Sequence, residues 1–531
     1  MKKTLRFLIL GTLPFLSILI IIIFFNIIKL DSKYAHKSMY TYQNPFNWFE
    51  YKIKVGIVKL IINFRDIYRP GLSHKRIYLD EQKQNQLLID TPKSTKIWQR
   101  GFHLDKSNNI KPMQARFRGD NPRNWLFEKK HWRMKVDKKD IINQQRYFDY
   151  LPFNFNKYLS GKIANEIGVL SPNLGLIELY VNDTSQGVYI ESENLNESFL
   201  RRKKIMPVNM YKTEQILDES IVALESNFFN SPGVASKSAV FNQMPKDDKS
   251  DLIFFLELIR LSNNDDKYFA NLFDSIGVEK WALFAAYQIL TQNFHNDNTH
   301  NLRLVIDPWS GFFYPIAHDP LIGNLNTEDF NLNYSSNDLL VLLNQSSKFQ
   351  ELKLKKLFEI LNSENIKELI KEHKNLEKNL MISEKRDVEL LVEKFNFFKL
   401  LKILINKNYV DKQRMDARLK FLNTYKEYLG ELNSYLTKKP DGNWKKVKGG
   451  FEIAVNKNLP LSNIKIYFEN DVPEWISLDL NENNKLDKNE EKFKFYSRNN
   501  YFLVPYNFYA NRLDFREVTT HLSHINLSTL N

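Results

Sequence analysis

The sequence predicts an α+β fold in which strands and helices occupy separate stretches of the chain. Residues 96–205 have mainly strand-like patterns, residues 206–437 mainly helical ones, and residues 440–531 return to short strands. Apolar residues alternate with polar ones in the strand-like stretches and recur every three or four positions in the helical one. We therefore expect a β-rich lobe, a helical lobe and a separate all-β module.

The composition is that of a globular protein. A chain of 531 residues is long enough for about three domains. The net charge is +14, but the basic residues are spread along the chain and form no nucleic-acid-binding motif, so we expect no nucleic-acid partner. There is no cysteine, which excludes disulfides, thiolate catalysis and cysteine-bound zinc.

The N-terminus predicts a membrane anchor. Residues 7–28 carry no charge, and about 20 apolar residues suffice to cross a bilayer as a helix. Lys2, Lys3 and Arg6 precede this stretch and favour a cytoplasmic N-terminus, although basic residues also follow it. We expect residues 1–30 to be a single-pass signal anchor, with the rest of the chain outside the cytoplasm.

Residues 31–95 are predicted to be a stalk or extension. Within them, residues 51–64 place Ile, Val and Leu at helical spacing. This amphipathic piece could lie on the membrane surface or dock as an ordinary helix on the rest of the protein.

The β-rich stretch contains the first candidate binding residues. In the segment WRMKV, residues 132–136, apolar side chains alternate with Arg133 and Lys135, so the two cations share one face of a strand. Arg116 and Arg118 likewise lie on one side of a strand that ends at a glycine.

The helical stretch ends in a polar region. A buried helix, residues 278–292, is expected to lead into a loop that contains Asp297 and Asn301, and an apolar hairpin then leads to Asp319. Phosphotransferases hold a nucleophile and Mg²⁺ with such residues. Asp297 can accept a proton from an attacking hydroxyl, whereas Asn301 and Asp319 offer hard oxygen ligands. A solvated Asx-rich turn is the alternative interpretation.

The C-terminal module contains a second candidate metal site. Residues 479–490, DLNENNKLDKNE, fit the 12-residue EF-type calcium loop. The ligands would be Asp479, Asn481, Asn483, the carbonyl of Lys485, Asp487 and Glu490. The flanks are strand-like, so this would be an isolated Ca²⁺ loop between strands. A polar hairpin loop with a chance pattern is the alternative.

Taken in order, five segments resemble the CotH kinase family, the spore-coat-type atypical protein kinases. The family shows an R-x-R-G segment, a K-K-x-[YF]-R-x-K strand, an A-x-E-x-G-x-x-[SA]-P helix end, a V-N-x…G-x-Y-x-x-x-E hairpin and acid-rich loops. The corresponding segments here are ARFRGDNP, KKHWRMKV, KYLSGKIANEIGVLSP, VNDTSQGVYIESE and the loops around Asp297 and Asp319. The resemblance covers roughly residues 95–435.

The resemblance implies a two-lobe, kinase-like core that binds ATP with Mg²⁺ or Mn²⁺. It implies that Lys135, or Arg133 close behind it, meets the ATP phosphates and that Glu166 orients that cation. Arg118 would cover the phosphates, and Glu193 would lie near the nucleotide. The implied reaction is transfer of the γ-phosphoryl group to Ser or Thr of an envelope or surface protein. Alternatively, Lys135 is a solvent-facing strand cation and Glu166 an ordinary surface residue.

One departure from the family pattern leaves a rival open. Where the family commonly has a further acid in the second loop, this chain has Ala317, and the tryptophan usual before it is missing. Either one acid suffices, or the core is a pseudokinase-like scaffold of a surface protein that binds a protein or glycan. A metallohydrolase is a third hypothesis, because His295, His300 and His318 could hold zinc with an acid.

Overall fold

The structure is a computed structural model. It describes residues 53–56, 71–89, 97–105, 107–119, 124, 129–213, 227–239, 245, 247–263, 266–293, 295–299, 301–325, 332, 334–344, 346–384, 386–387 and 409–437, together with eight C-terminal strands between residues 442 and 528. The predicted anchor and the predicted calcium loop after Asp479 lie outside the described residues. Within the described part of the chain, no helix has both the length and the apolar character needed to cross a membrane.

The chain divides into two compact units. Unit 1 comprises residues 1–155, 173–194 and 372–419, and unit 2 comprises residues 156–172, 195–371 and 420–531. Helices and strands occur in both, which confirms the α+β class.

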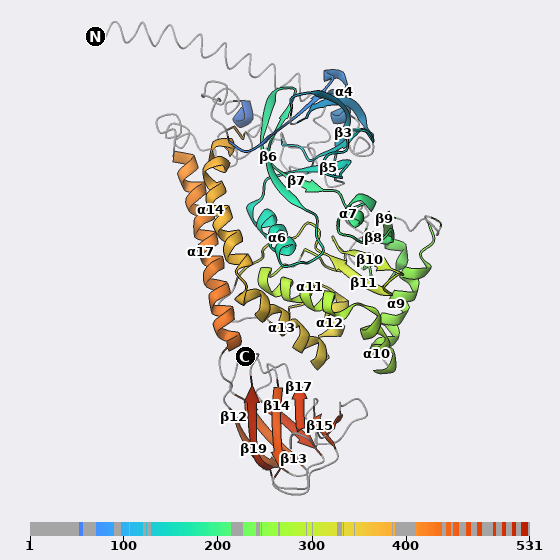
Figure 1. The fold of residues 1–531 in the computed structure, drawn as a ribbon, viewed down its shortest axis with the longest axis vertical. Coiled ribbons are helices and arrows are strands. Elements are labelled where there is room, and N and C mark those ends of the chain that lie inside the picture. Colours follow the sequence, from blue (N-terminus) through green and yellow to red (C-terminus); the bar gives the residue numbers. More distant parts are fainter. Residues whose placement is uncertain are drawn as a thin grey trace, which may run out of the picture. The chain divides into compact units, whose positions relative to one another are not determined.

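Unit 1 contains a closed barrel of seven strands, which the sequence did not predict (Figure 1). The order around the barrel is β1-β2-β3-β4-β5-β7-β6, and β1 closes it by pairing in parallel with β6. Closure leaves no unpaired sheet edge. The strands are β1 (His74–Leu79), β2 (Gln99–Leu104), β3 (Ile110–Phe117), β4 (Trp132–Val136), β5 (Tyr147–Pro152), β6 (Leu174–Val181) and β7 (Thr184–Glu193).

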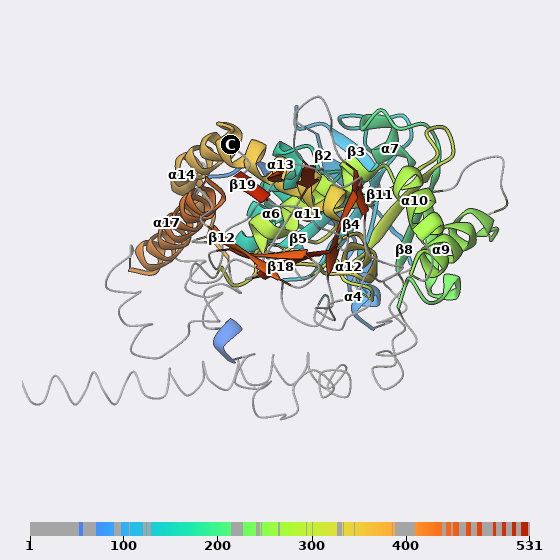
Figure 2. The ribbon, with the colours of Figure 1, turned by 90° about the horizontal axis from the view of Figure 1, so that it is seen from below.

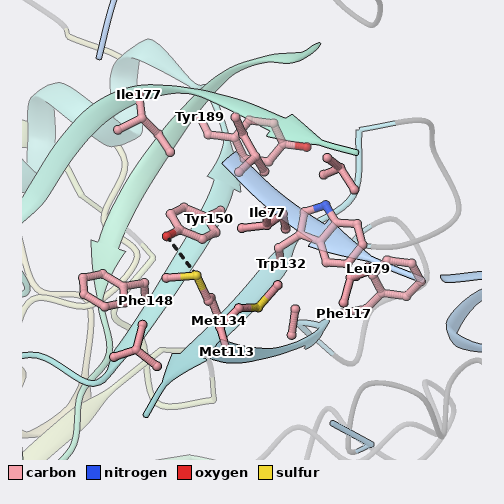
Figure 3. Close-up of a cluster of buried hydrophobic side chains, with 14 of the residues drawn as sticks. Ile77, Leu79, Met113, Phe117, Trp132, Met134, Phe148, Tyr150, Ile177 and Tyr189 are labelled. Carbon is pink, nitrogen blue, oxygen red and sulfur yellow. Dashed lines mark hydrogen bonds between the residues drawn. The ribbon is translucent and has the colours of Figure 1, made fainter. Parts of the chain in front are cut away.

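The barrel interior is filled by apolar and aromatic side chains from every barrel strand except β2, together with Leu87 of helix α4 (Glu81–Ile89) (Figure 3). Trp132 and Met134 of β4 point inward and are buried, and the hydroxyl of Tyr150 donates to the Met134 sulfur at 3.8 Å. Arg133 and Lys135 alternate with them and are only partly buried. The predicted alternation of WRMKV is therefore confirmed, with both cations on the outer face of the barrel.

A turn after helix α14 (Asn365–Glu384) is anchored to the β6–β7 hairpin within unit 1. Arg386 donates from Nε to Glu178 Oε1 at 2.7 Å, and both side chains are buried. The carboxylate of Asp387 pairs with Lys129 and accepts the backbone N–H of Val188 at 3.1 Å. Two buried ion pairs thus fasten this turn to the barrel.

Helix α4 lies in unit 1, together with the first residue of α6 (Phe155–Glu166) and part of α17 (Tyr409–Thr437). Figures 1 and 2 show α14 and α17 side by side, and Arg418 of α17 donates to Glu377 and Glu384 of α14 at 2.7–3.1 Å.

Unit 2 contains a four-stranded antiparallel sheet in the order β11-β10-β8-β9. Its strands are β8 (Asn209–Thr213), β9 (Ala235–Ala239), β10 (Arg303–Asp307) and β11 (Phe312–Ile316). Its helices, besides most of α6 and parts of α14 and α17, are α7 (Glu197–Arg202), α9 (Ser250–Ser262), α10 (Asp266–Ser275), α11 (Val278–Thr291), α12 (Asp338–Leu343) and α13 (Ser347–Asn362). Helix α11 is buried almost throughout, as the sequence predicts, and its Trp281 indole donates to the Phe313 carbonyl at 2.6 Å.

The C-terminal strands form two antiparallel sheets, one of five strands (β12-β13-β18-β15-β16) and one of three (β17-β14-β19). Their bounds are β12 (Gly442–Val447), β13 (Gly450–Val455), β14 (Asn463–Phe468), β15 (Trp475–Asp479), β16 (Lys492–Lys494), β17 (Phe502–Pro505), β18 (Arg512–Arg516) and β19 (Leu522–Ser528). Asp479, the first predicted calcium ligand, is the last residue of β15.

Candidate functional site

The β10–β11 hairpin brings two predicted site residues to the same end of a sheet. Arg303, which begins β10, pairs with Ile316, which ends β11. Asn301 lies two residues before β10 and Asp319 three residues after β11. Because the hairpin is antiparallel, the loops that contain Asn301 and Asp319 meet at its open end.

Two fully buried asparagines join these loops. Asn293 accepts the N–H of Leu321 at 3.2 Å and donates to the side-chain oxygen of Asn296 at 2.8 Å. Asn296 donates to the carbonyls of His318 at 2.7 Å and Asn301 at 3.2 Å. Sequence analysis did not single out either amide. Their hydrogen bonds satisfy buried polar groups and hold the two loops in one arrangement.

Both predicted metal ligands have a left-handed backbone. The φ angle is +57° at Asn301 and +51° at Asp319, and Gln292 at the end of α11 has a φ of +48°. Asn and Asp tolerate this conformation better than most residues. Such outliers gather at functional sites, where the surrounding structure holds them in place.

The carboxylate of Asp319 lies between the side chains of a lysine and a histidine. Its Oδ1 is 2.5 Å from Lys157 Nζ, and its Oδ2 is 3.8 Å from His295 Nδ1. The same Nδ1 is 2.7 Å from the Asp319 carbonyl oxygen, which accepts a hydrogen bond when this ring nitrogen carries the proton. The Asn301 side-chain nitrogen lies 3.3 Å from Nδ1. The pair of Lys157 and Asp319 was not predicted, because the sequence shows no link between the two segments.

Asp297 lies in the first loop and is partly exposed. Its Oδ1 accepts the backbone N–H of Thr299 at 2.8 Å and the Thr299 hydroxyl at 3.0 Å. This is the Asx turn that the sequence left open as an alternative. These two hydrogen bonds hold Oδ1 of the carboxylate in place. His300, which follows Thr299, lies outside the described residues.

The residues of these two loops suit a magnesium-type ion. Among the described residues, no group of three or more His, Cys, Asp or Glu side chains could hold a metal. Mg²⁺ needs no such cage, because it keeps several waters and takes one or two carboxylates together with phosphate oxygens of its substrate. Asp297, Asn301 and Asp319 would supply only hard oxygen donors, and Asp319 already pairs with one cation, the Lys157 ammonium.

Ala317 is the point where the second loop departs from the family pattern. Its side chain is fully buried, and its N–H donates to the carbonyl of Leu170 at 2.9 Å. This position therefore contributes packing and a backbone hydrogen bond and no carboxylate.

Two of the predicted nucleotide-binding cations in unit 1 share one buried carboxylate. Arg133 donates to both oxygens of Asp149 at 2.5 and 2.7 Å, and Arg118 donates to Oδ2 at 2.9 Å. Burial alone would raise the pKa of Asp149, but the guanidiniums of Arg133 and Arg118 outweigh it and hold that pKa far below its usual range. Asp149 was missed, although it is a lone acid in an otherwise apolar strand and lies directly opposite Arg133.

Lys135 has different surroundings. Its Nζ lies 4.8 Å from the centre of the Trp98 ring, and no carboxylate of the described residues pairs with it. It lines a cavity of about 520 Å³ that Arg100 and Arg146 also line. Burial, followed by the charges of Arg146 and Arg116, lowers the pKa of Lys135. The cavity wall is therefore electropositive.

The two predicted glutamates lie in different units. Glu193 ends β7, is buried, and accepts the N–H of Asn173 at 3.2 Å. It lies opposite Phe148 in the β5–β7 pairing, whereas Asp149 lies opposite Ser192. Glu193 therefore shares the inner face of the barrel with Phe148. Glu166 is the exposed last residue of α6 and belongs to unit 2, so its pairing with Lys135 of unit 1 stays a prediction.

Comparison with known proteins identifies one family. A family model described as CotH kinase protein matches residues 115–389, more than half of the chain. No curated protein matches the chain.

Two solved structures show weak similarity. One is the Shewanella oneidensis MR-1 toxin–antitoxin complex of HipA, HipB and operator DNA, at 9% identity and a TM-score of 0.20, over 54% of this chain and 60% of that chain. The other is the Helicobacter pylori proinflammatory kinase CtkA, at 12% identity and a TM-score of 0.20, over 49% of this chain and 94% of that chain. At these TM-scores neither similarity adds to the family match.

Proposed function

The chain belongs to the CotH kinase family, and from this premise we propose that it is a membrane-anchored protein kinase. It would transfer the γ-phosphoryl group of ATP to serine or threonine hydroxyls of envelope or surface proteins. The observation that supports this most is the meeting of the Asn301 and Asp319 loops at the open end of the β10–β11 hairpin. The Asp297 loop is continuous with the first of them.

In the proposed reaction the acceptor hydroxyl attacks the γ-phosphorus, the bond to the β-phosphate oxygen breaks, and ADP leaves. Asp297 orients the hydroxyl and takes its proton. Asn301 and Asp319 would hold Mg²⁺ or Mn²⁺ through their oxygens. When bound, the metal supplies positive charge to the phosphate oxygens.

ATP would bind to the predicted cations of unit 1. We propose Lys135 as the first cation to meet its phosphates, supported by its cavity and by the absence of a carboxylate partner among the described residues. Arg133 and Arg118 would also contact the phosphates while they remain paired with Asp149. Glu166 and Glu193 are proposed to orient the cation and to contact the nucleotide, respectively.

The proposal includes the location of the protein. The charge-free residues 7–28 would anchor it, with the catalytic part outside the cytoplasm and a protein substrate at the surface or in the envelope. Residues 479–490 would bind Ca²⁺, as their EF-type spacing indicates.

A non-catalytic scaffold is the second candidate, and Ala317 favours it. That buried alanine places no carboxylate where the family commonly has one. The presence of Asp297, Asn301 and Asp319 together favours the kinase.

A transfer assay on the full-length protein in detergent tests the proposal. The protein would be incubated with γ-labelled ATP, Mg²⁺ or Mn²⁺ and an envelope fraction, beside Asp297→Asn and Asp319→Asn. Asp274→Asn is the matched control, because Asp274 is an exposed acid of α10 in the same unit. We expect label on protein with the wild type and the control, and none with the two site variants. Metal-dependent nucleotide binding without transfer would support a pseudokinase-like scaffold. The absence of both binding and transfer would contradict the kinase and favour a scaffold that does not use nucleotide.

A further inference from the structure

The proposed metal-binding carboxylate already pairs with a cation that belongs to the protein. Lys157 lies in the first turn of α6, and its Nζ is 2.5 Å from Asp319 Oδ1. The two side chains are each 19% exposed, so the pair is shielded but open to solvent. Nothing in the family resemblance assigns a role to this lysine.

We propose that Lys157 is a positioning residue that acts as an exchangeable counter-ion of Asp319. It occupies the carboxylate when no metal is bound and releases it when a metal–nucleotide complex binds. Its ammonium then pairs with a phosphate oxygen of the nucleotide. This inference rests on the proposed function of the site.

Charge balance is the physical reason for the exchange. With Lys157 in place, the negative charge of Asp319 is neutralised within a partly shielded site. A divalent ion that binds the same carboxylate brings two positive charges close to the ammonium, and the repulsion is stronger there than in bulk water. Metal alone must therefore compete with Lys157. Metal that arrives with a nucleotide also brings phosphate charges, which offer the ammonium a new partner.

The surroundings of Lys157 allow the side chain to move without its helix. The hydroxyl oxygens of Ser160 on α6 and Tyr287 on α11 are both buried and lie 2.7 Å apart, which fastens α6 to the core of unit 2. The lysine side chain is a flexible four-carbon stem with a compact charge, so the ammonium can change partner by rotation about its bonds. His295, at 3.8 Å from the other oxygen of Asp319, can remain in place during the exchange.

Binding of Mn²⁺ to the full-length protein tests the inference without relying on activity. The signal of free hydrated Mn²⁺ in electron paramagnetic resonance gives the affinity, with and without a non-hydrolysable ATP analogue. Without the analogue, Lys157→Met should bind Mn²⁺ roughly tenfold more tightly than the wild type, the effect of about 1.4 kcal/mol. In the presence of Mn²⁺, the affinity of the same variant for the analogue should fall by a similar factor.

Two controls separate this inference from simpler explanations. Lys162→Met removes the same charge from the same helix and should change neither affinity, because no described partner of Lys162 belongs to the site. Lys157→Arg keeps the charge and should retain the weak binding of metal alone. If circular dichroism shows that the methionine variant does not fold, the arginine variant serves as the test. Tighter binding of metal alone by the arginine variant would then overturn the inference.

The outcomes distinguish the two proposals. If Lys157→Met binds both Mn²⁺ and the analogue as the wild type does, the lysine is merely structural and the inference is wrong. The proposed function would still stand, provided that Asp319→Asn lowers analogue-dependent Mn²⁺ binding. If Asp319→Asn binds Mn²⁺ like the wild type, the metal site of the proposed function is itself wrong.

Discussion

Two lysine–aspartate pairs of the same chemistry lie in different surroundings in the two units. The side chains of Lys129 and Asp387 in unit 1 are 4% and 0% exposed, whereas those of Lys157 and Asp319 in unit 2 are each 19% exposed. A carboxylate that is fully enclosed can neither exchange its partner nor meet a substrate. We infer that the pair in unit 1 maintains the fold and that the pair in unit 2 belongs to the chemistry.

The backbone around each pair supports the same distinction. Gly187 has a φ of +83°, and a Cβ atom there would overlap the carboxyl group of Asp387. The glycine of the family-like GVY segment is therefore explained by the close approach of a structural carboxylate. In the second pair, Asp319 itself has the left-handed backbone, which fixes the direction of its own side chain. Neighbouring residues therefore enclose the pair of Lys129 and Asp387, whereas the backbone of its own loop orients Asp319 in the second pair.

The largest effect is expected from a change within the site of unit 2. Asp297→Asn removes the proposed proton acceptor but keeps the oxygen that Thr299 bonds. Transfer should fall by about 10²–10⁴-fold, the usual contribution of a general base, while the unfolding midpoint stays unchanged. Phosphate transfer and thermal denaturation measure the two properties. Thr299→Val is the control, and an equal loss of transfer in that variant would show that Asp297 acts only by holding its turn.

The next largest effect is expected from a change in the pair of unit 1, which should lower stability and leave the site of unit 2 unchanged. Asp387→Asn leaves the buried ammonium of Lys129 without its charge partner, which should cost about 3–5 kcal/mol of unfolding free energy. Hydrogen exchange of the β7 amides would measure it locally. The double variant Lys129→Met with Asp387→Leu should recover much of the loss, since an apolar pair needs no counter-charge. Mn²⁺–nucleotide binding by the folded fraction should not change, and a loss of that binding would contradict the division of roles.

A third test varies the pH to titrate Asp149, another buried carboxylate of unit 1. The pKa of Asp149 is held far below its usual value of about 3.9 by Arg133 and Arg118. A carboxylate whose pKa is lowered by folding stabilises the folded state. This stability is fully present above the unfolded-state pKa and is lost as the pH falls from that value toward the folded-state pKa. The urea midpoint should therefore remain level from neutral pH to about pH 5 and decline below about pH 4.

Arg133→Met is the matched variant for the pH test. It removes one charged hydrogen-bond donor pair, which should cost about 1.5–3 kcal/mol at pH 7. Because burial then acts on Asp149 with less opposition, its folded-state pKa moves up toward the unfolded value, and the decline of the urea midpoint below about pH 4 should become smaller. A pH profile identical to that of the wild type would show that Arg118 alone determines the charge state of Asp149.

The local patterns were predictable because each depends on neighbours in the sequence. The alternation in β4 placed Trp132 inside and Lys135 outside, and the apolar hairpin between two polar loops placed Asn301 near Asp319. Those inferences need only strand periodicity and the geometry of an antiparallel turn.

Features that depend on distant segments could not be predicted in this way. Barrel closure needs β1 to pair with β6 about 100 residues later, and β1 lies in the range that the sequence suggested as a stalk. Lys157 and Asp149 acquire their roles only through partners that the fold brings to them. The sequence gives the type of a charged residue, but only the fold shows its partner and whether it is enclosed or partly exposed.

The smallest effect is expected from an ion pair that is exposed on both sides. Arg260 donates twice to Glu257 on α9, at 2.9 and 2.5 Å, yet the side chains are 65% and 51% exposed. Water and salt screen such a pair, and alanine is a good helix former, so Arg260→Ala should leave the unfolding midpoint within experimental error. The measurement is the same denaturation curve used for Asp387→Asn, at low and high salt. If Arg260→Ala lowered the unfolding midpoint as much as Asp387→Asn does, burial would not explain why some ion pairs of this protein stabilise the fold and others do not.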